Sequence, residues 1–517
     1  MNKKIMSAAQ AAELIKDNST IGMGGFFCSG LPEAVYGAVE ERFLSAGHPK
    51  NLSLIWIGAC GLRNHAGADH FAHDGMVRRV MAGHFGFVPE ISQMIIDEKI
   101  EGYNVPQGAL VFMMRDSAAG RIGTITPVGL ESFADPRNGG GRLNSITKED
   151  IVKVIEIDGQ EQLYYPRVGV DVAIIRGTYA DELGNVTLEK EMGPLDSTAL
   201  AMAAHNNGGK VIVQVEKVVK HGSLDPKLVK IPGIYVDAIV ICPAEDPRAA
   251  QILGGGYEPA YAGNVQIPVS SIEPKPLDVK KIIGRRAAME LRHNVVVNLG
   301  IGIPEYVAAV ASEEGLEQEM TLTVESGPIG GVPGSGPRFG GSINPQAFVD
   351  TSTQFDFYDG GGIDVCFLGM GQADVEGNVN VSRFGTNLTG CGGFISISSN
   401  SKKIVYCGPF TNGVKIKTGD GKLEILEEGG QRKFINKVRE VTFSGHNAAK
   451  HNKDVLYVTE RAVFRLEKDG LHLTEIAPGV DLKTQILDQM DFEPIVDANL
   501  KIMDERIFRD EPMGLTL

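Results

Sequence analysis

The feature that most constrains the fold of this chain is an internal repeat. Three segments of the first half recur, in the same order, in the second half of the 517-residue sequence. The pairs are 3–14 with 280–291, 21–26 with 298–303, and 171–187 with 364–380. Three matches in one order favour a duplication over chance, so we expect two similar halves. A chain of this length is also expected to form two or more domains, because single hydrophobic cores stop growing well below it.

Each half alternates helix-like patterns with apolar, strand-like runs such as 210–216 and 403–407. Alternation of this kind is typical of βα units on a mostly parallel sheet. The sequence therefore predicts an α/β fold made of two similar, duplicated α/β domains with mostly parallel sheets and with the active site between them.

The domain boundaries follow from the repeat and from a stretch rich in Gly, Pro and Ser. We expect an N-terminal domain over 1–255, a linker over 256–278 and a C-terminal domain over 279–517. The first and third repeated segments start 168 positions apart in the first half, at 3 and 171, but only 84 apart in the second, at 280 and 364. The first half therefore carries extra material, which we place around 85–165.

The composition argues against several classes of function. The net charge of −15 disfavours a nucleic-acid-binding surface and attraction to anionic membranes. The 6 cysteines are scattered without a CxxC pair, which is typical of reduced thiols in a cytosolic protein. The N-terminus lacks an apolar signal-peptide segment, and no apolar run approaches the roughly 18 residues of a membrane span. We therefore expect a cytoplasmic protein that binds neither nucleic acid nor membrane.

Glu325 stands where a buried strand is predicted to end. The run 321–324 is apolar and β-branched, and a stretch rich in Gly and Pro follows over 326–337. Such a pattern predicts a strand that stops in a tight loop. Ligands bind at this end of the strands in open α/β sheets, and a carboxylate placed there is costly unless it has a partner or a function. Glu325 is therefore a candidate functional residue, with a solvated surface charge as the alternative.

Other motifs are weaker. The Gly-x-Gly turns at 22–24 and 300–302 lack the rest of the dinucleotide-binding fingerprint, so each is either a structural turn or an anion cradle. Neither G-x-S-x-G nor the phosphate-loop pattern occurs. Four histidines lie close in sequence but without H-E-x-x-H or a placed carboxylate partner, namely His65, His70, His73 and His84. We expect ordinary surface or packed histidines and no metal site.

Two further segments could supply hydrogen-bond donors. Gln107 lies between turn residues, where a solvated side chain is the alternative to a functional one. The glycine turn 390–393 precedes an apolar run, and its backbone N–H groups could bind an oxyanion or a thioester carbonyl. A lone carboxylate is already ionised near neutral pH and can attack an activated acyl group such as a thioester. The products are a mixed anhydride and a thiolate, and the thiolate can return to form an enzyme thioester.

Several motifs together resemble those of the fused-subunit family I CoA-transferases, of the bacterial propionate (acetate) CoA-transferase type. Besides the repeat, they are 298–305, 324–331, 355–362, 384–387, 390–394 and 512–515. The likeness runs essentially from end to end. It implies a ping-pong transfer of CoA from acyl-CoA to a short-chain carboxylate, such as acetate, propionate, lactate or butyrate, through a glutamyl-CoA thioester.

The resemblance also implies roles for individual residues. The thioester-forming glutamate falls on Glu325, and the oxyanion-stabilising groups fall on the Gln107 side chain and the backbone of Gly392 and Gly393. Contacts with CoA are expected at Asn298, Gly300, Gly302, Gly371 and Gly392. CoA is then a substrate, and no cofactor is implied. The expected partners are acyl-CoA and carboxylates, and the chain is expected to form a homo-oligomer, a dimer or a tetramer.

Two alternatives remain open on the sequence. In an acyl-CoA thioesterase on the same scaffold, water would intercept the thioester on Glu325. A non-catalytic acyl-CoA-binding protein would bind without turnover and would give Glu325 no role. Dependence of acyl-CoA loss on a carboxylate acceptor separates the transferase from the thioesterase.

Overall fold

The computed structural model describes residues 4–268 and 275–517, which form two compact units. Residue 3 of the first repeated segment and residues 269–274 of the predicted linker lie outside the described residues. The first unit holds the described chain up to Ile267 together with Val324–Asp356 and Gly385–Ser396, and the second holds the rest. The boundaries predicted from the repeat delimit halves of the sequence. The units differ from those halves because two segments of the second half belong to the first unit.

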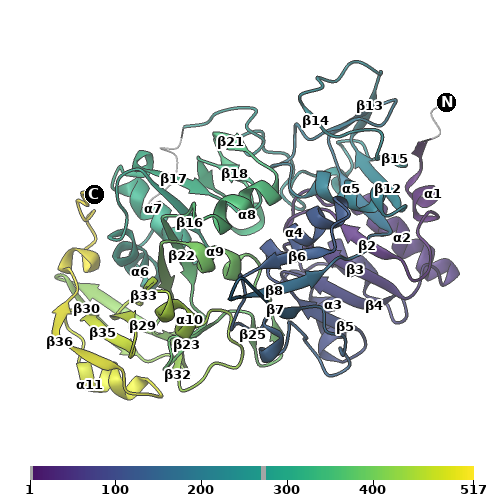
Figure 1. Cartoon of the computed structure of the whole chain (residues 1–517). Helices are drawn as coiled ribbons and strands as arrows, with labels where there is room; N and C mark the ends of the chain where they lie inside the picture. The colour runs from purple at the N-terminus through teal and green to yellow at the C-terminus, as the bar shows by residue number, and fades with distance from the viewer. Residues whose placement is uncertain (1–3, 269–274) are drawn as a thin grey trace. The chain divides into compact units, whose positions relative to one another are not determined.

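A sheet of eight parallel strands forms the centre of the first unit within the described chain (Figure 1). In spatial order the strands are β1 (Ile5–Met6), β15 (Ala238–Ile241), β12 (Lys210–Val215), β9 (Val172–Arg176), β2 (Thr20–Met23), β3 (Leu52–Trp56), β4 (Val77–Ala82) and β5 (Glu101–Asn104). Each neighbouring pair is parallel. The carboxyl ends of the strands therefore share one edge, which is where ligands bind in such sheets.

Helices cover both faces of this sheet. Successive side chains of a strand point to opposite faces, so apolar strands present apolar side chains on both faces that must be packed. Ile21 and Met23 of β2 join an apolar cluster that includes Val35 of one covering helix. Gly22 faces the other way, where a Cβ atom would lie 2.3 Å from Leu200 Cδ1. The helices on the first face are α1 (Ala8–Ala12), α2 (Glu33–Ala46) and α3 (Pro89–Ile96), and those on the second are α4 (Gln107–Ala118) and α5 (Ser197–Asn206) (Figure 1).

The second unit is built on a sheet in which parallel strands are followed by antiparallel ones. The strands that belong to this unit run in the order β17 (Met320–Thr323), β16 (Val295–Leu299), β22 (Val365–Gly369), β27 (Lys403–Cys407), β33 (Asp454–Val458), β34 (Ala462–Glu467), β35 (Gly470–Ile476) and β36 (Ile495–Ile502). The pairs from β17 to β33 are parallel, β34 is antiparallel to both neighbours, and β36 is parallel to β35. Helices α6 (Val279–Ala288) and α7 (Glu305–Glu313) pack on each other.

Smaller elements complete the two units. An antiparallel sheet of β6 (Gly123–Thr126), β8 (Gln160–Pro166) and β7 (Lys153–Ile157) belongs to the first unit, as do β10 (Tyr179–Asp181), β11 (Val186–Thr187), β13 (Lys217–Val219) and β14 (Val229–Ile231). The second unit adds β23 (Gln372–Asp374), β24 (Val379–Asn380), β29 (Lys415–Gly419), β30 (Lys422–Glu427), β32 (Phe434–Ile435) and α10 (Gly445–Lys450). Among the described residues, no helix combines the length and apolar character that a membrane span requires.

The repeat seen in the sequence is present in the topology. The order β3-β2-β9-β12-β15 of the first unit matches β17-β16-β22-β27-β33 of the second. The paired aspartates make the same bond: Asp171 accepts the N–H of Thr20 at 2.8 Å, and Asp364 accepts the N–H of Val296 at 2.8 Å. The prediction of two similar α/β domains with mostly parallel sheets is therefore confirmed.

Candidate active site

Glu325 lies two residues beyond the end of β17, in a turn closed by backbone hydrogen bonds. The N–H of Val324 donates to Pro328 O at 3.1 Å, and the N–H of Gly327 donates to Val324 O at 3.0 Å. Gly327 has φ +124°, and a Cβ atom there would lie 2.1 Å from Val349 O, so the turn requires glycine. The Glu325 side chain is 7% exposed, which rules out a solvated surface charge.

Ser326 fixes the segment that follows the glutamate. Its buried hydroxyl donates to Gly340 O, and its carbonyl accepts the Thr351 hydroxyl at 3.4 Å. A Cβ atom at Gly340 would lie 2.5 Å from the ring of Phe26. Because Phe26 follows the carboxyl end of β2, the loop after Glu325 packs at the strand ends of the sheet in the first unit.

Gln107 is the first residue of α4 and follows the carboxyl end of β5. Its side chain is 1% exposed, so it is not the solvated loop residue of the alternative reading. Its backbone N–H donates to Gly392 O at 3.0 Å, which brings two predicted site residues together. The Nε2 atom has no hydrogen-bond partner among the described residues. Leaving a buried donor unpaired costs roughly 1–3 kcal/mol, so this group is poised for a ligand acceptor.

The glycine turn 390–393 is held against the strand ends of β4 and β5. The N–H of Cys391 donates to Asn104 Oδ1 at 3.0 Å, and Asn104 Nδ2 donates to Gly83 O at 2.7 Å. Gly390 has φ +82°, and a Cβ atom there would lie 2.7 Å from Gly83 O. Asn104 therefore positions the turn, a role that no local pattern indicated because its partner is 287 positions away.

The two predicted backbone donors differ in this structure. The N–H of Gly392 already donates to Gly83 O at 2.8 Å. The N–H of Gly393 makes no hydrogen bond within the described chain, and the residue is buried. Of the two glycines, Gly393 is thus the one whose N–H is available to an oxyanion.

A buried aromatic cluster connects the loop of Glu325 with the glycine turn. The rings of Phe27 and Phe339 lie 4.8 Å apart, and those of Phe27 and His84 lie 5.7 Å apart. A Cβ atom at Gly392 would lie 3.8 Å from His84 Cδ2. The cluster also contains Phe26, Cys28, Ala59, Met192, Leu195, Ile252 and Tyr261. An apolar wall of this kind suits a short acyl group.

His84 is a site-lining residue that the sequence did not single out. Its Nδ1 accepts the N–H of Gly86 at 3.2 Å. Burial, together with the nearby positive charge of Arg63, lowers the pKa of His84 to about 4, so the ring is neutral at physiological pH. The sequence grouped His84 with three other histidines, but the structure places it at the strand ends, away from their shared carboxylate.

Four of the five expected CoA contacts lie in the second unit, whereas the fifth, Gly392, belongs to the first unit. Asn298 is in β16, and its Nδ2 donates to Thr323 O and to the Tyr358 hydroxyl oxygen, both at 3.2 Å. The N–H of Gly300 donates to Phe367 O at 2.8 Å. The remaining two, Gly302 and Gly371, follow the carboxyl ends of β16 and β22. The three glycines therefore share one edge of the sheet, whereas the Asn298 amide is engaged in holding β17.

The other three histidines surround one glutamate of α2. Glu40 Oε1 lies 2.8 Å from His65 Nε2 and 2.7 Å from His73 Nε2, and Glu40 Oε2 lies 2.6 Å from His70 Nδ1. The expectation that these histidines lack a carboxylate partner is therefore wrong. The sequence did not reveal Glu40 as their partner because it is distant from them along the chain. Burial opposes protonation of His70, but hydrogen bonds to Glu33 and Glu40 outweigh it and raise the pKa of His70 to about 9.

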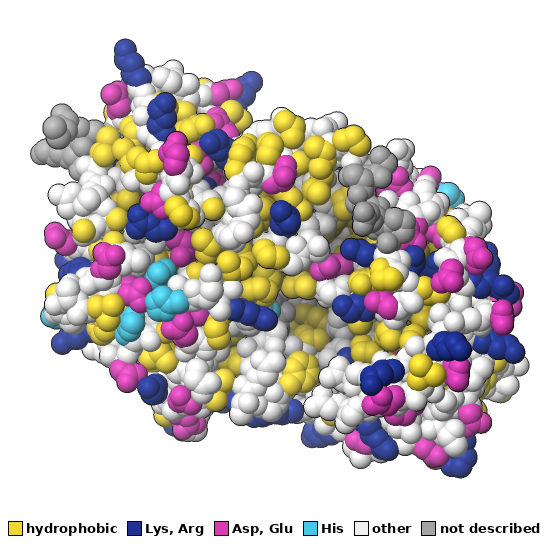
Figure 2. Space-filling view, turned by 180° about the vertical axis from the view of Figure 1, so that it is seen from behind, with side chains coloured by type: hydrophobic (Ala, Val, Ile, Leu, Met, Phe, Trp, Pro, Cys, Tyr) yellow, Lys and Arg dark blue, Asp and Glu magenta, His cyan; other side chains and the backbone are white. Residues whose placement is uncertain are grey.

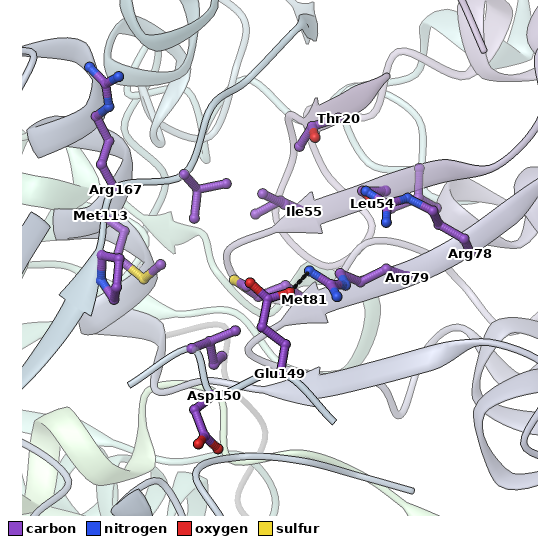
Figure 3. Close-up of a pocket in the computed structure, with 14 residues that line it drawn as sticks. Thr20, Leu54, Ile55, Arg78, Arg79, Met81, Met113, Glu149, Asp150 and Arg167 are labelled. Carbon is purple, nitrogen blue, oxygen red and sulfur yellow. Dashed lines mark ion pairs between the residues drawn. The ribbon is translucent and has the colours of Figure 1, made fainter. Parts of the chain in front are cut away.

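A cavity of about 220 Å³ opens at the edge of the first unit's eight-stranded sheet that lies opposite Gln107 and the glycine turn (Figure 3). Thr20 begins β2, Ser53 lies near the start of β3, and Arg79 lies near the start of β4, so this edge carries the amino ends of the strands. Arg79 Nη1 pairs with Glu149 Oε2 at 2.7 Å across the cavity wall. None of the predicted site residues lines it.

Comparisons with known proteins identify the family of this chain. A family model described as coenzyme A transferase matches residues 5–241. The caffeate CoA-transferase of Acetobacterium woodii is 46% identical over 99% of this chain and 98% of its own. The acetate CoA-transferase YdiF of Escherichia coli K12 is 44% identical over 99% of this chain and 96% of its own. The crystal structure of the acyl-CoA transferase YdiF from E. coli O157:H7, a thioester complex with CoA, matches with a TM-score of 0.94 and 42% identity, over 100% of this chain and 98% of that one.

The fold and these relatives define a CoA-transferring enzyme of the α/β class. With these relatives, the chain belongs to the family I CoA-transferases. It is an enzyme that transfers CoA, so the alternative of a non-catalytic acyl-CoA-binding protein is excluded.

Proposed function

We propose that this enzyme transfers CoA between short-chain acyl-CoA and short-chain carboxylates, such as acetate and propionate, through a thioester on Glu325. The observation that carries the proposal is a buried carboxylate in a glycine-dependent turn at a strand end. The same compact unit holds Gln107, whose buried Nε2 atom has no hydrogen-bond partner among the described residues. One relative is named for acetate and another for caffeate, so the family accommodates different acids, and the short acyl group is our inference for this chain.

The proposed reaction has two balanced halves. The Glu325 carboxylate attacks the carbonyl carbon of acyl-CoA, the C–S bond breaks, and a mixed anhydride and a CoA thiolate result. The thiolate then attacks the Glu325 carbonyl carbon, and the C–O bond breaks to release the first carboxylate. The acceptor carboxylate repeats both steps in reverse and restores the Glu325 carboxylate. No proton donor, metal or cofactor is needed for these exchanges.

Each attack creates a tetrahedral oxyanion. Donors that are fixed in a water-poor site stabilise such an intermediate more than the ground state. Gln107 Nε2 and the N–H of Gly393 are the two donors that fit this role, because both are buried and neither is used within the described chain. Gly392 instead supplies the carbonyl that fixes the backbone of Gln107.

CoA itself is proposed to contact the strand-end glycines of the second unit, Gly300, Gly302 and Gly371. Binding energy from the remote parts of CoA would then position the reacting thioester. We also propose a cytoplasmic homo-oligomer, a dimer or a tetramer, without a resident cofactor for the chemistry. All six cysteines are buried and none forms a disulfide, which agrees with a reducing compartment.

The deciding experiment is incubation with propionyl-CoA in the absence of an acceptor. CoA should become covalently attached to the enzyme, and peptide mapping should place it on Glu325. Initial-rate plots with acetate as acceptor should be parallel, as a ping-pong reaction requires. Continuous loss of acyl-CoA without an acceptor would identify the thioesterase instead, and intersecting plots without an adduct would indicate a ternary complex.

A further inference from the structure

The three imidazoles around Glu40 form the strongest cluster of metal-ligating atoms outside the candidate active site. The ligand atoms of Glu40, His65 and His70 all lie within 4.8 Å of one another. His73 Nε2 approaches the same carboxylate at 2.7 Å. Histidine side chains gather beside acidic ones on the face shown in Figure 2.

A second layer of carboxylates orients these rings. His65 Nδ1 lies 3.0 Å from both oxygens of Glu90, and His70 Nε2 lies 3.1 Å from Glu33 Oε2. Glu33 is itself fixed, because its Oε1 accepts the N–H of Gly67 at 2.8 Å. Histidines that bind metals usually donate their other ring nitrogen to a carboxylate in this way, which fixes the ring and its tautomer.

We propose that Glu40, His65, His70 and His73 bind one divalent transition-metal ion, with Zn²⁺ as the fitting ion. Three imidazoles and one carboxylate are a donor set that Zn²⁺ accepts, at about 2.0–2.2 Å from each ligand atom. Imidazole nitrogens also disfavour Mg²⁺ and Ca²⁺, which take oxygen ligands. The ion would take the place of the direct contacts between Glu40 and the three rings.

The site would be structural and not part of the transfer chemistry. Glu40 lies in α2, His70 in the short 3-10 helix Gly67–Phe71, and Glu90 in α3. One ion would therefore tie the loop after β3 to α2 directly, and to α3 through the contact of His65 with Glu90. The His70 side chain is 15% exposed and that of His65 is 44% exposed, so an ion can enter from solvent.

The test is calorimetric titration of the chelator-treated full-length enzyme with Zn²⁺. One Zn²⁺ per chain should bind with micromolar or tighter affinity and should raise the unfolding temperature. His65→Gln and His73→Gln each remove one ligand on a part-exposed side chain and should weaken binding at least about tenfold. Glu90→Gln removes only an outer partner and should weaken binding by roughly 10–100-fold.

His48→Gln is the matched control. His48 also pairs with a carboxylate, Asp17 at 2.9 Å, but has no neighbouring histidine, so its loss should leave Zn²⁺ affinity unchanged. Unchanged affinity in His65→Gln, His73→Gln and Glu90→Gln, or no saturable binding by the wild type, would overturn the proposal and leave the cluster as an ion-pair network. Transferase activity should persist after chelation, because no ligand of the proposed ion belongs to the active site.

Discussion

The two repeats share a frame but differ at one strand end. In the second repeat, β17 leads through Val324 to the buried carboxylate of Glu325. In the first repeat, the matching strand β3 leads to Ile57 and Gly58, which carry no ionisable group. A Cβ atom at Gly58 would lie 2.5 Å from the Phe26 ring, so this position is shaped for packing. The two repeats thus share a scaffold, and only the strand end of the second carries the carboxylate that we propose as the nucleophile.

The two repeats also share individual hydrogen bonds that hold their loops. Asp181 accepts the backbone N–H groups of Leu183 and Asn185, both at 2.9 Å. Asp374 accepts those of Glu376 and Asn378, at 3.1 and 3.0 Å. Buried hydrogen bonds of this kind fix loop geometry without contributing chemistry. The comparison therefore separates residues that hold the fold in both halves from residues that act in one.

Replacing the proposed nucleophile is expected to have the largest effect. Glu325→Ala and Glu325→Gln should each lower kcat by more than about 100-fold, a loss above ~2.7 kcal/mol of transition-state stabilisation. Unfolding temperature should stay close to that of the wild type, since the turn depends on Gly327. Retained activity above this level, after deamidation of the Gln variant has been excluded by mass spectrometry, would remove Glu325 from the mechanism.

Removing the amide donor from the first half of the sequence should have the next largest effect. Gln107→Ala should lower kcat by about 10²–10³ with a smaller change in KM, because a donor aimed at an oxyanion acts mainly in the transition state. Gln93→Ala is the matched control, since the side-chain amide of Gln93 in α3 donates to Asp97 on the exposed side of its own helix. A change confined to KM would make Gln107 a ground-state binding contact.

Sequence patterns predicted those features of this molecule that short stretches of the chain determine by themselves. The repeat gave the fold class, and an apolar run before glycines gave the strand end and the tight turn at Glu325. The roles of Gln107 and of the glycine turn came from family resemblance. Asn104 and Glu40 were missed because their partners are distant in sequence, 287 positions for Cys391 and 30 for His70. Only the folded backbone shows that the N–H of Gly392 is used and that of Gly393 is not.

The equivalent aspartates of the two repeats, Asp181 and Asp374, allow the stability of the two loops to be compared. Asp181→Ala and Asp374→Ala should each destabilise their own loop by about 1–3 kcal/mol, because buried backbone donors lose their acceptor. The two losses should be similar in size, and neither variant should change the site of covalent labelling by acyl-CoA. Urea unfolding monitored by hydrogen exchange would locate each loss. A large drop in labelling for only one variant would show that its loop has acquired a role in the active site.

The smallest effect at neutral pH is expected from His84, which places a neutral ring at the strand ends of the first unit. Its folded-state pKa of about 4 lies below the value near 6.5 of an unfolded histidine. Between these two pH values the unfolded chain binds more protons, so the stability that His84 contributes is lost as the pH falls from 6.5 to 4.

In His84→Asn, the Oδ1 atom can still accept the N–H of Gly86, but the titrating group is gone. Urea unfolding from pH 7 to 4 should therefore show a shallower loss in the variant, by up to about 1.36 kcal/mol per pH unit. Equal slopes would mean that the pKa of His84 is the same in the folded and the unfolded chain. The strand ends of the first repeat would then gain a positive charge below about pH 6.5 instead of keeping an uncharged wall.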